Sequence, residues 1–414
     1  MSWKRSLTLL VAIVGVLFVT AGVGTVAGQS APDCSAVTYN GDGTEANPYE
    51  VGNVEQLQCI EEQGLDANYV QVSDIDALET AVWNDNEGFD PIGGRGLLFN
   101  GTFDGAGNEI TGLTIDTINE DAGMFSNVGP PGTVTNVSVR QVDITGPRVG
   151  GVVGVNLGTV RGSSASGTVE SGSSSDAGGL VGSNLGTVRD SSASVDVTSP
   201  KEGGGLIGFN EGIVRDSSAS GEVTGPDIMG GLVGQNRGGI VRGSSASGDV
   251  TGGGLMGGLV GFNDGGIVRD SSASGNVEGG DSVGGLVGES TEDSVLRSSS
   301  ASGNVEGEIV VGGLVGKSTR DSVLRSSSAS GNVEGDENVG GLVGYNDEEG
   351  TVEMSSATGN VTGNVSVGGL VGYNLDTVEK SYAMGASFGF EENVGGLVGI
   401  NRGIVEDSYA RGAV

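Results

Sequence analysis

The sequence contains no histidine, and this absence limits the chemistry that the protein can perform. Ser-His-Asp and Cys-His catalytic groups, HExxH zinc sites and histidine pH switches all need an imidazole. None of them can operate in this chain. Carboxylate chemistry, ligand binding and architecture remain as classes of function.

Proline and aromatic residues are scarce, whereas glycine is abundant. The 414 residues include 8 prolines and 4% aromatic residues, against 82 glycines. Collagen is excluded, because there is no strict three-residue glycine period and too little proline. Disorder is the other explanation for so much glycine, but valine, leucine and isoleucine recur too regularly for a chain without a core.

Positive charge is the next deficit. Only 19 lysines and arginines stand against 53 acidic residues, which gives a formal charge of −34. Such a polyanion is repelled by nucleic acid and by anionic membranes, so we expect neither as a partner. An ordinary acidic secreted protein and a protein from a hypersaline habitat both fit. We favour the second, because the Debye length falls to about 3 Å near 1 M salt and dense surface carboxylates then repel one another little.

The only long apolar run lies at the N-terminus. Lys4 and Arg5 precede an apolar segment over residues 7–18, and small residues follow up to Gly28. This pattern predicts a signal peptide over residues 1–28 and an extracellular or cell-surface location. The alternative is an uncut membrane anchor, since the apolar stretch is long enough to span a bilayer.

Cysteine occurs only twice, at Cys34 and Cys59. Exported chains meet oxidising conditions, so we expect a disulfide between the two. It would close a loop of about 25 residues and add roughly 3 kcal/mol in the chain-entropy model. Two unpaired buried thiols are the alternative.

A repeat dominates the remainder of the chain. A Gly-Gly-Leu-Val-Gly block, with minor variants, recurs ten times at spacings of 26 to 28 residues, and a degenerate earlier copy starts at Gly123. Five residues after the second glycine stands a serine in two copies, Ser290 and Ser318, and an asparagine in the other eight. These asparagines are Asn156, Asn184, Asn210, Asn236, Asn263, Asn346, Asn374 and Asn401.

The apolar runs within each copy are too short and too often broken by glycine for helices. We expect three short strands per period and an all-β fold, a parallel β-helix (β-solenoid) of about 11 coils. Each strand would pair with its copy one coil away, at roughly 4.8 Å. A propeller is the alternative, but its blades need about 40 residues. The asparagines are expected at left-handed corners, with their amides bonded into a ladder.

The pattern resembles the GLUG-motif repeats of secreted and cell-surface proteins. In one copy the likeness comprises Gly179-Leu180-Val181-Gly182, Asn184, Gly186, Val188, Ser191, Ala193 and Val197. It covers residues 123–414, and the composition suggests a halophilic archaeon as the source. The resemblance implies architecture and no catalytic role. Some bacterial immunoglobulin-A-cleaving metallopeptidases carry such repeats, but their zinc-binding histidines have no counterpart in this chain.

Residues 29–122 are expected to form an N-terminal cap with the first irregular coils, and residues 123–414 the repeat solenoid. The segment 53–60 predicts a short helix, with Asn53 as N-cap and an apolar face that includes Leu57. The opposite end shows no such cap. Either nearby charges of Glu391, Glu392, Glu406 and Asp407 protect the last coil, or this end associates with another subunit or surface, which makes end-to-end self-association a hypothesis.

Two repeat positions are candidate ligand-binding columns. An arginine column consists of Arg161, Arg189, Arg215, Arg242, Arg269, Arg297 and Arg325, with Glu353, Glu379 and Glu406 at the same position in the last copies. It is either a solvated face balanced by neighbouring acids or a stripe that grips an acidic polysaccharide, because guanidinium groups match carboxylates. An aromatic column of Phe209, Phe262, Tyr345 and Tyr373 could stack on sugars, although isolated surface rings are common.

Carboxylates are the remaining candidates for chemistry. Asp74, Asp76 and Asp104 could serve a secreted β-helix lyase or hydrolase. Calcium is a second option, at Asn40, Asp42 and Thr44 or at Asn84, Asp85 and Glu87. Neither set completes a loop signature, so we expect no cofactor. We therefore expect a non-catalytic extracellular binding or adhesion module, with glycans or cell-surface proteins as partners. The alternative is the secreted carbohydrate-active enzyme.

Overall fold

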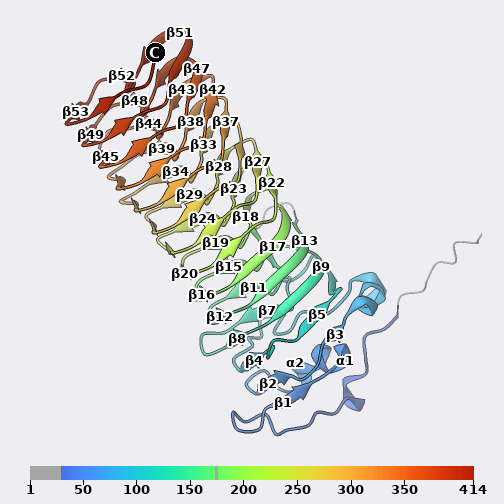
Figure 1. Ribbon diagram of the computed structural model, residues 1–414. Helices are drawn as coiled ribbons and strands as arrows, with labels where there is room; N and C mark the ends of the chain where they lie inside the picture. The colour runs from blue at the N-terminus through green and yellow to red at the C-terminus, as the bar shows by residue number, and fades with distance from the viewer. Residues whose placement is uncertain (1–28, 173–175) are drawn as a thin grey trace, which may run out of the picture.

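The chain folds into an elongated rod of stacked coils, which confirms the predicted β-solenoid (Figure 1). The computed structural model describes residues 29–172 and 176–414. The predicted signal peptide, residues 1–28, lies outside the described residues. Within them, no helix is both long and apolar enough to cross a membrane.

Three parallel sheets run the length of the rod. Sheet 1 has 14 strands, sheet 2 has 11 and sheet 3 has 29. The strands of sheet 1 are β1 (Tyr49–Val51), β2 (Asn68–Gln71), β4 (Thr102–Asp104), β8 (Thr133–Thr135), β12 (Thr159–Arg161), β16 (Thr187–Arg189), β20 (Ile213–Arg215), β25 (Ile240–Arg242), β30 (Ile267–Arg269), β35 (Val295–Arg297), β40 (Val323–Arg325), β45 (Thr351–Glu353), β49 (Thr377–Glu379) and β53 (Ile404–Glu406). The strands of sheet 2 are β7 (Phe125–Val128), β11 (Val153–Asn156), β15 (Val181–Asn184), β19 (Ile207–Asn210), β24 (Val233–Arg237), β29 (Val260–Asp264), β34 (Val287–Thr291), β39 (Val315–Ser318), β44 (Val343–Asn346), β48 (Val371–Asn374) and β52 (Val398–Asn401).

Sheet 3 supplies up to three short strands to each coil. Its strands are β3 (Ile75–Asp76), β5 (Glu109–Thr111), β6 (Thr114–Asp116), β9 (Ser138–Gly146), β10 (Val149–Gly150), β13 (Ser164–Ser171), β14 (Asp176–Gly178), β17 (Ser192–Thr198), β18 (Glu202–Gly204), β21 (Ser218–Ala219), β22 (Val223–Gly225), β23 (Ile228–Gly230), β26 (Ser245–Ala246), β27 (Val250–Gly252), β28 (Leu255–Gly257), β31 (Ser272–Ala273), β32 (Val277–Glu278), β33 (Ser282–Gly284), β36 (Ser300–Ala301), β37 (Val305–Gly307), β38 (Val310–Gly312), β41 (Ser328–Ala329), β42 (Val333–Gly335), β43 (Glu337–Gly340), β46 (Ser356–Ala357), β47 (Val361–Gly368), β50 (Tyr382–Ala383), β51 (Ser387–Gly395) and β54 (Tyr409–Ala410).

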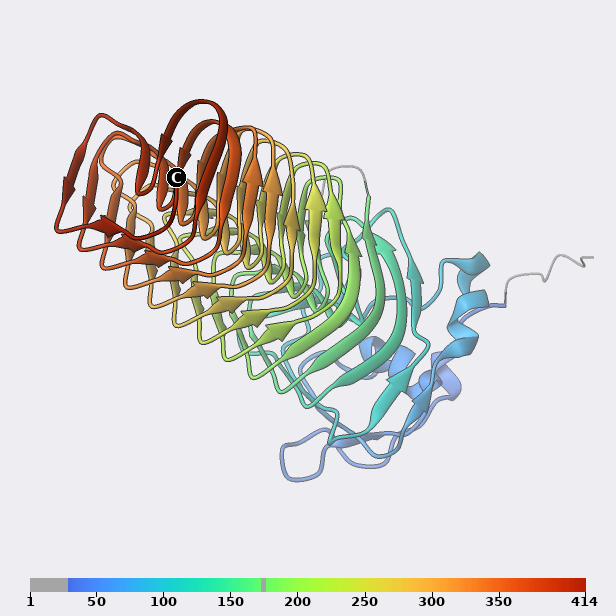
Figure 2. The ribbon, with the colours of Figure 1, turned by 45° about the horizontal axis from the view of Figure 1, so that its top comes forward.

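One full coil therefore has more strand segments than the three that the repeat predicts. The coil that begins at β19 continues through β20, β21, β22 and β23 before β24 lies beside β19 (Figure 2). Sheet 3 is interrupted at the glycine between β21 and β22, where a Cβ on Gly221 would lie 1.9 Å from the carbonyl oxygen of Val195. Only glycine allows the neighbouring coil to approach this closely.

Buried aliphatic side chains fill the interior of the coils. The apolar pair of each Gly-Gly-Leu-Val-Gly block is buried, as Leu232 and Val233 illustrate at 0% exposure, except in the last coil, where Leu397 and Val398 are partly buried. The first glycine of the block is required by space, because a Cβ on Gly230 would lie 1.9 Å from the carbonyl oxygen of Val233. The strict repeat thus reflects a narrow core in which identical side chains stack on one another.

The asparagines form a buried ladder, but they do not stand at left-handed corners. Within the first five asparagines each amide Nδ2 donates to the next Oδ1, at 2.7 to 2.8 Å. The ladder stops at the serine coils, resumes at Asn346 and ends at Asn401. The left-handed residues instead follow the arginine column, for example Asp216 at φ 50° and Ser298 at φ 52°. The expectation of left-handed asparagines was wrong, because these residues lie in the strands of sheet 2 and none of them has a positive φ.

The N-terminal region supplies a bulkier core. The predicted helix is split into α1 (Val54–Gln58) and α2 (Ile60–Gln63), and Asn53 Oδ1 accepts from Gln56 N at 2.8 Å. Leu57 and Ile60 are fully buried among rings that include Tyr69 and Phe99. The remaining helical turns are η1 (Cys34–Ala36), η2 (Leu78–Val82) and η3 (Asn84–Asn86).

A disulfide joins Cys34 to Cys59 across this region. At the far end of the rod the last coil is more exposed than the others, with Ile404 53% and Tyr409 46% accessible. The expected end-to-end association through this coil stays a prediction.

Candidate functional site

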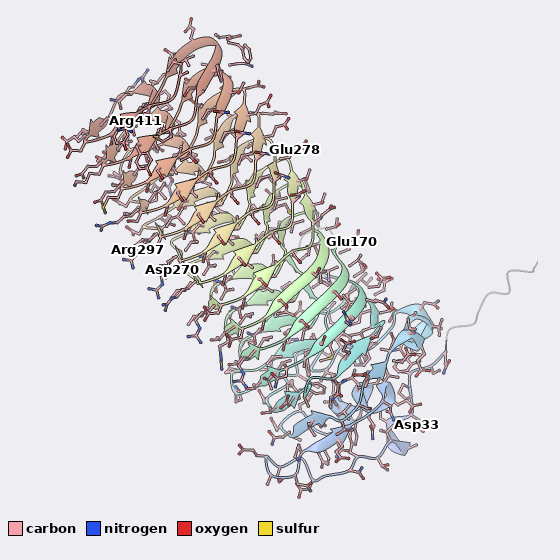
Figure 3. The ribbon with its side chains drawn as sticks, in the orientation of Figure 1. Asp33, Glu170, Asp270, Glu278, Arg297 and Arg411 are labelled. Atoms are coloured by element: carbon pink, nitrogen blue, oxygen red, sulfur yellow. A yellow bond between two sulfur atoms is a disulfide. The ribbon has the colours of Figure 1, made fainter. Side chains whose placement is uncertain are left out.

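The arginine column forms a continuous ridge along one edge of the rod. Each arginine ends a strand of sheet 1, and the pairing of these strands sets every arginine beside the next, as in Arg215↔Arg242 and Arg269↔Arg297. The chain turns sharply after each of them, because the following residue adopts a left-handed backbone. We call the seven arginines from Arg161 to Arg325 the arginine ridge. Figure 3 shows Arg297 of the ridge and the neighbouring Asp270 on the same edge of the rod.

Nearby carboxylates balance only part of this ridge. Arg189 pairs with Asp190 at 2.9 Å and Arg215 with Asp216 at 3.3 Å. Asp270 pairs with Arg242 of the preceding coil, at 3.7 Å, and Glu353 pairs with Arg325 at 3.4 Å.

Three arginines of the ridge are left without an acidic partner. Arg161, Arg269 and Arg297 form no ion pair with any residue that the structure describes. Arg161 donates to the hydroxyl of Thr135, whereas Arg269 Nε is buried without a hydrogen-bond acceptor. Arg269 and Arg297 are neighbours in the ridge, so this part of it carries positive charge that no carboxylate of the described residues compensates.

The aromatic column lies on a different face. Phe209, Phe262, Tyr345 and Tyr373 occupy one register position in sheet 2, not in sheet 1. All four rings are partly buried.

Most of these rings already have partners. Tyr345 and Tyr373 stack at 5.2 Å, and the guanidinium carbons of Arg237 and Arg402 lie 5.0 and 5.6 Å from the ring centroids of Phe209 and Tyr373. Within residues 29–172 and 176–414, no ring of this column lies against an arginine of the ridge; the two cation–π partners, Arg237 and Arg402, lie outside it. The structure therefore does not combine the two columns into one site.

The three candidate catalytic aspartates each cap a local backbone turn or strand. Asp74 Oδ1 accepts from Glu109 N at 2.9 Å, and Asp76 Oδ1 accepts from Leu78 N at 3.0 Å. Asp104 Oδ1 accepts from Ala106 N and from Asn136 Nδ2 at 2.9 and 3.0 Å. These hydrogen bonds explain why aspartate suits each position.

The candidate calcium loops are occupied by similar local bonds. Asp42 Oδ1 accepts from the backbone N and the hydroxyl of Thr44, and these bonds hold the pKa of Asp42 below its usual range. Asn84 Nδ2 donates to the carbonyl oxygen of Gly88 at 2.9 Å. In the described part of the chain, no group of three or more acidic or cysteine residues is arranged to hold a metal ion. The expectation of no cofactor, with calcium as the second option, stays a prediction.

Sequence reasoning missed an acidic groove on sheet 3. It follows β27, β32, β37, β42 and β47, has a volume of about 680 Å³ and ends at the ring of Phe388. Its floor carries two outward columns, one of asparagines and one that includes Glu278, Glu306 and Glu334 in register. The Gly-Asn-Val-Glu sequence of three successive copies was the signal, because residues two apart in a strand share a face.

A buried carboxyl pair was also missed. Asp176 lies beside Glu202 in the register of β14 and β18, and Glu202 is only 4% exposed. Lys201 Nζ lies 2.7 Å from Glu202 Oε1. Burial, and then the neighbouring Glu202, raise the pKa of Asp176 to about 7. This pair occurs in one coil only, so no repeat pattern in the sequence indicated it.

Comparisons with known proteins agree with the repeat architecture. The sequence model described as "The GLUG motif" matches residues 145–170, 173–198, 228–251, 252–278 and 335–362. The chain therefore carries GLUG-motif repeats.

Two curated relatives share part of the sequence. Halomucin of Haloquadratum walsbyi is 39% identical over 161 residues, which cover 36% of this chain and 2% of Halomucin. A protein of Evansella cellulosilytica, named as a Gly-rich membrane protein, is 35% identical over 162 residues, or 38% of this chain and 18% of that protein. The chain thus matches only a small part of either relative.

One solved structure is also similar. A protein of Bacteroides ovatus, named as an immunoglobulin A1 protease, aligns with 63% of this chain and 77% of its own chain. The TM-score is 0.44 at 20% sequence identity.

Proposed function

We propose that this chain is the solenoid of an exported acidic surface protein and acts as a non-catalytic binding or adhesion module. Its similarity to Halomucin and to a protein named as a membrane protein supports a location at the cell surface or outside the cell. The acidic composition and the Haloquadratum relative support a hypersaline habitat.

The arginine ridge is the observation that supports a ligand for this module. Its guanidinium groups repeat at the spacing of stacked strands, roughly 4.8 Å, along a straight edge. Arg269 and Arg297 keep their charge unpaired within the described residues. A guanidinium binds a carboxylate through two parallel hydrogen bonds. The ligand that fits this edge is an extended polysaccharide with carboxylate groups.

Salt decides whether such a ligand can approach. The chain carries a formal charge of −34, so a polyanion is repelled at low ionic strength. Near 1 M salt the Debye length of about 3 Å screens distant carboxylates, whereas a guanidinium in direct contact with its ligand is screened less. We therefore expect binding of an acidic glycan to persist, or to rise, as salt increases from low values.

The test is a glycan array probed with the purified chain at several salt concentrations. We expect retention of uronate-containing glycans over neutral ones. The variant Arg269→Gln/Arg297→Gln/Arg325→Gln should lose this preference. The control Arg140→Gln, an exposed arginine that pairs with Glu109 outside the ridge, should keep it. Equal binding by all three proteins would contradict the proposal, and release of oligosaccharide products would favour the enzyme alternative.

A further inference from the structure

The acidic groove and the arginine ridge occur together in three successive coils. Arg269, Arg297 and Arg325 are each followed nine residues later by a glutamate of the groove, Glu278, Glu306 or Glu334. Both columns are in parallel register from coil to coil. They therefore rise along the rod by the same step and span the same length of it.

The two columns have opposite charge and opposite shape. The arginines stand on an edge where the chain turns, whereas the glutamates line a groove of about 680 Å³. Glu278, Glu306 and Glu334 are exposed, and no cation of the described residues pairs with them. Like charges stacked one coil apart repel one another, so a row of cations in the groove would relieve this repulsion.

The two columns also lie on opposite sides of the molecule. In Figure 3, Arg297 lies along one long edge of the rod and Glu278 along the other. A second copy placed beside the first, in the same direction and without a shift along the axis, presents its arginine ridge to the acidic groove at matching heights. The same contact can then repeat on the free side of each copy, because a contact between two different surfaces leaves both available at the ends.

We propose that copies of this chain associate side by side, with the arginine ridge of one copy seated in the acidic groove of the next. A single contact of this kind is weak, since exposed ion pairs contribute little individually. Several pairs in register, and repetition from copy to copy, make the array stronger than one contact. This inference does not depend on glycan binding, although a glycan on the ridge would compete with the neighbouring copy.

Salt should affect this association in two opposite ways. Long-range repulsion between two chains of charge −34 weakens once the Debye length falls to about 8 Å near 0.15 M salt. Contacting pairs are screened appreciably only near 1 M, where the Debye length is about 3 Å. We expect association to be strongest at intermediate salt.

The test is sedimentation of the full chain and of two charge-reversed variants over a series of protein and salt concentrations. One variant is Arg269→Glu/Arg297→Glu/Arg325→Glu, and the other is Glu278→Arg/Glu306→Arg/Glu334→Arg. Each variant alone should lose self-association by at least tenfold in the association constant. An equimolar mixture should recover it, because the acidic ridge of one variant meets the basic groove of the other.

A matched control separates contact from net charge. The variant Glu45→Arg/Glu79→Arg/Glu87→Arg changes the net charge as much as the groove variant does, but its sites are exposed positions of the N-terminal region. It should associate like the original chain, and circular dichroism should show all variants folded.

Three results would overturn the proposal. The first is that the original chain sediments as a monomer at every protein and salt concentration. The second is that either charge-reversed variant alone still associates, and the third is that the two variants do not associate when they are mixed. The glutamate variant also separates this proposal from glycan binding, since it should lose association while it retains acidic glycans.

Discussion

Replacement of one ladder asparagine tests how the coils are held in register. Asn236 is fully buried, and its Oδ1 accepts from Asn210 Nδ2 at 2.7 Å. Its own Nδ2 donates to Asn263 Oδ1 at 2.7 Å and to the carbonyl oxygen of Gly239 at 3.1 Å. The substitution Asn236→Ala removes these three bonds and leaves their partners buried without water.

The expected cost follows from these bonds. Each buried hydrogen bond contributes about 1 kcal/mol net, and a partner left unpaired costs about 1–3 kcal/mol. We expect Asn236→Ala to lower the free energy of unfolding by about 3–5 kcal/mol. Asn236→Ser should cost less, because a hydroxyl keeps part of the bonding and the chain itself has serine at this position in Ser290 and Ser318.

Urea unfolding followed by circular dichroism measures this loss. The matched control is Asn276→Ala in the exposed asparagine column of the groove, where Oδ1 accepts only from Asn304 N at 3.1 Å. Water can replace that bond, so the control should cost less than about 1 kcal/mol. Equal losses for Asn236→Ala and Asn276→Ala would refute the argument that the buried ladder stabilises the stack.

Three further outcomes are expected. Cys34→Ser/Cys59→Ser should lower stability by roughly 3 kcal/mol, because the bridge closes a sequence separation of 25 residues; urea unfolding measures it, and an unchanged midpoint would contradict the estimate. Asp176 has its pKa raised to about 7 in the folded protein, so its contribution to stability is greatest at low pH and falls as pH rises from about 4 to about 7. Asp176→Asn should flatten the dependence of the melting temperature on pH over that range. An unaltered slope would contradict this prediction, because the pH dependence would then come from other groups. The melting temperature should also be higher in 2 M than in 0.1 M sodium chloride, because salt screens the mutual repulsion of the surface carboxylates in a chain of charge −34. Equal melting temperatures would contradict the interpretation of a protein from a hypersaline habitat.

The repeat period was sufficient to predict the solenoid and its ladder. The five-residue spacing between Gly151 and Asn156 is the same in successive copies. This constancy indicates that each residue stacks on its counterpart one coil away. The same logic located the arginine ridge, because a repeated residue must form a column.

Features that depend on local backbone geometry could not be predicted from the repeat period of the sequence. The left-handed residue follows the arginine, and it is aspartate in some copies, serine or glycine in others. Because the residue type varies, the sequence does not reveal that all copies share this backbone conformation. We expected the left-handed residue at the asparagine, because asparagine adopts left-handed backbone more readily than most residues. The groove follows five neighbouring strands of sheet 3, and only the fold shows that Glu278 and Glu306 line it. The carboxyl pair of Asp176 and Glu202 occurs once and so leaves no periodic signal.

Calorimetric titration with a uronate oligosaccharide tests the central claim most directly, namely that the arginine ridge binds acidic glycans. In about 0.5 M salt, we predict that the Arg269→Gln/Arg297→Gln variant binds at least tenfold more weakly than the original chain, because a charge-assisted hydrogen bond contributes about 1.5–3 kcal/mol. The control Arg140→Gln should bind like the original chain. Equal affinity for all three proteins would contradict the claim.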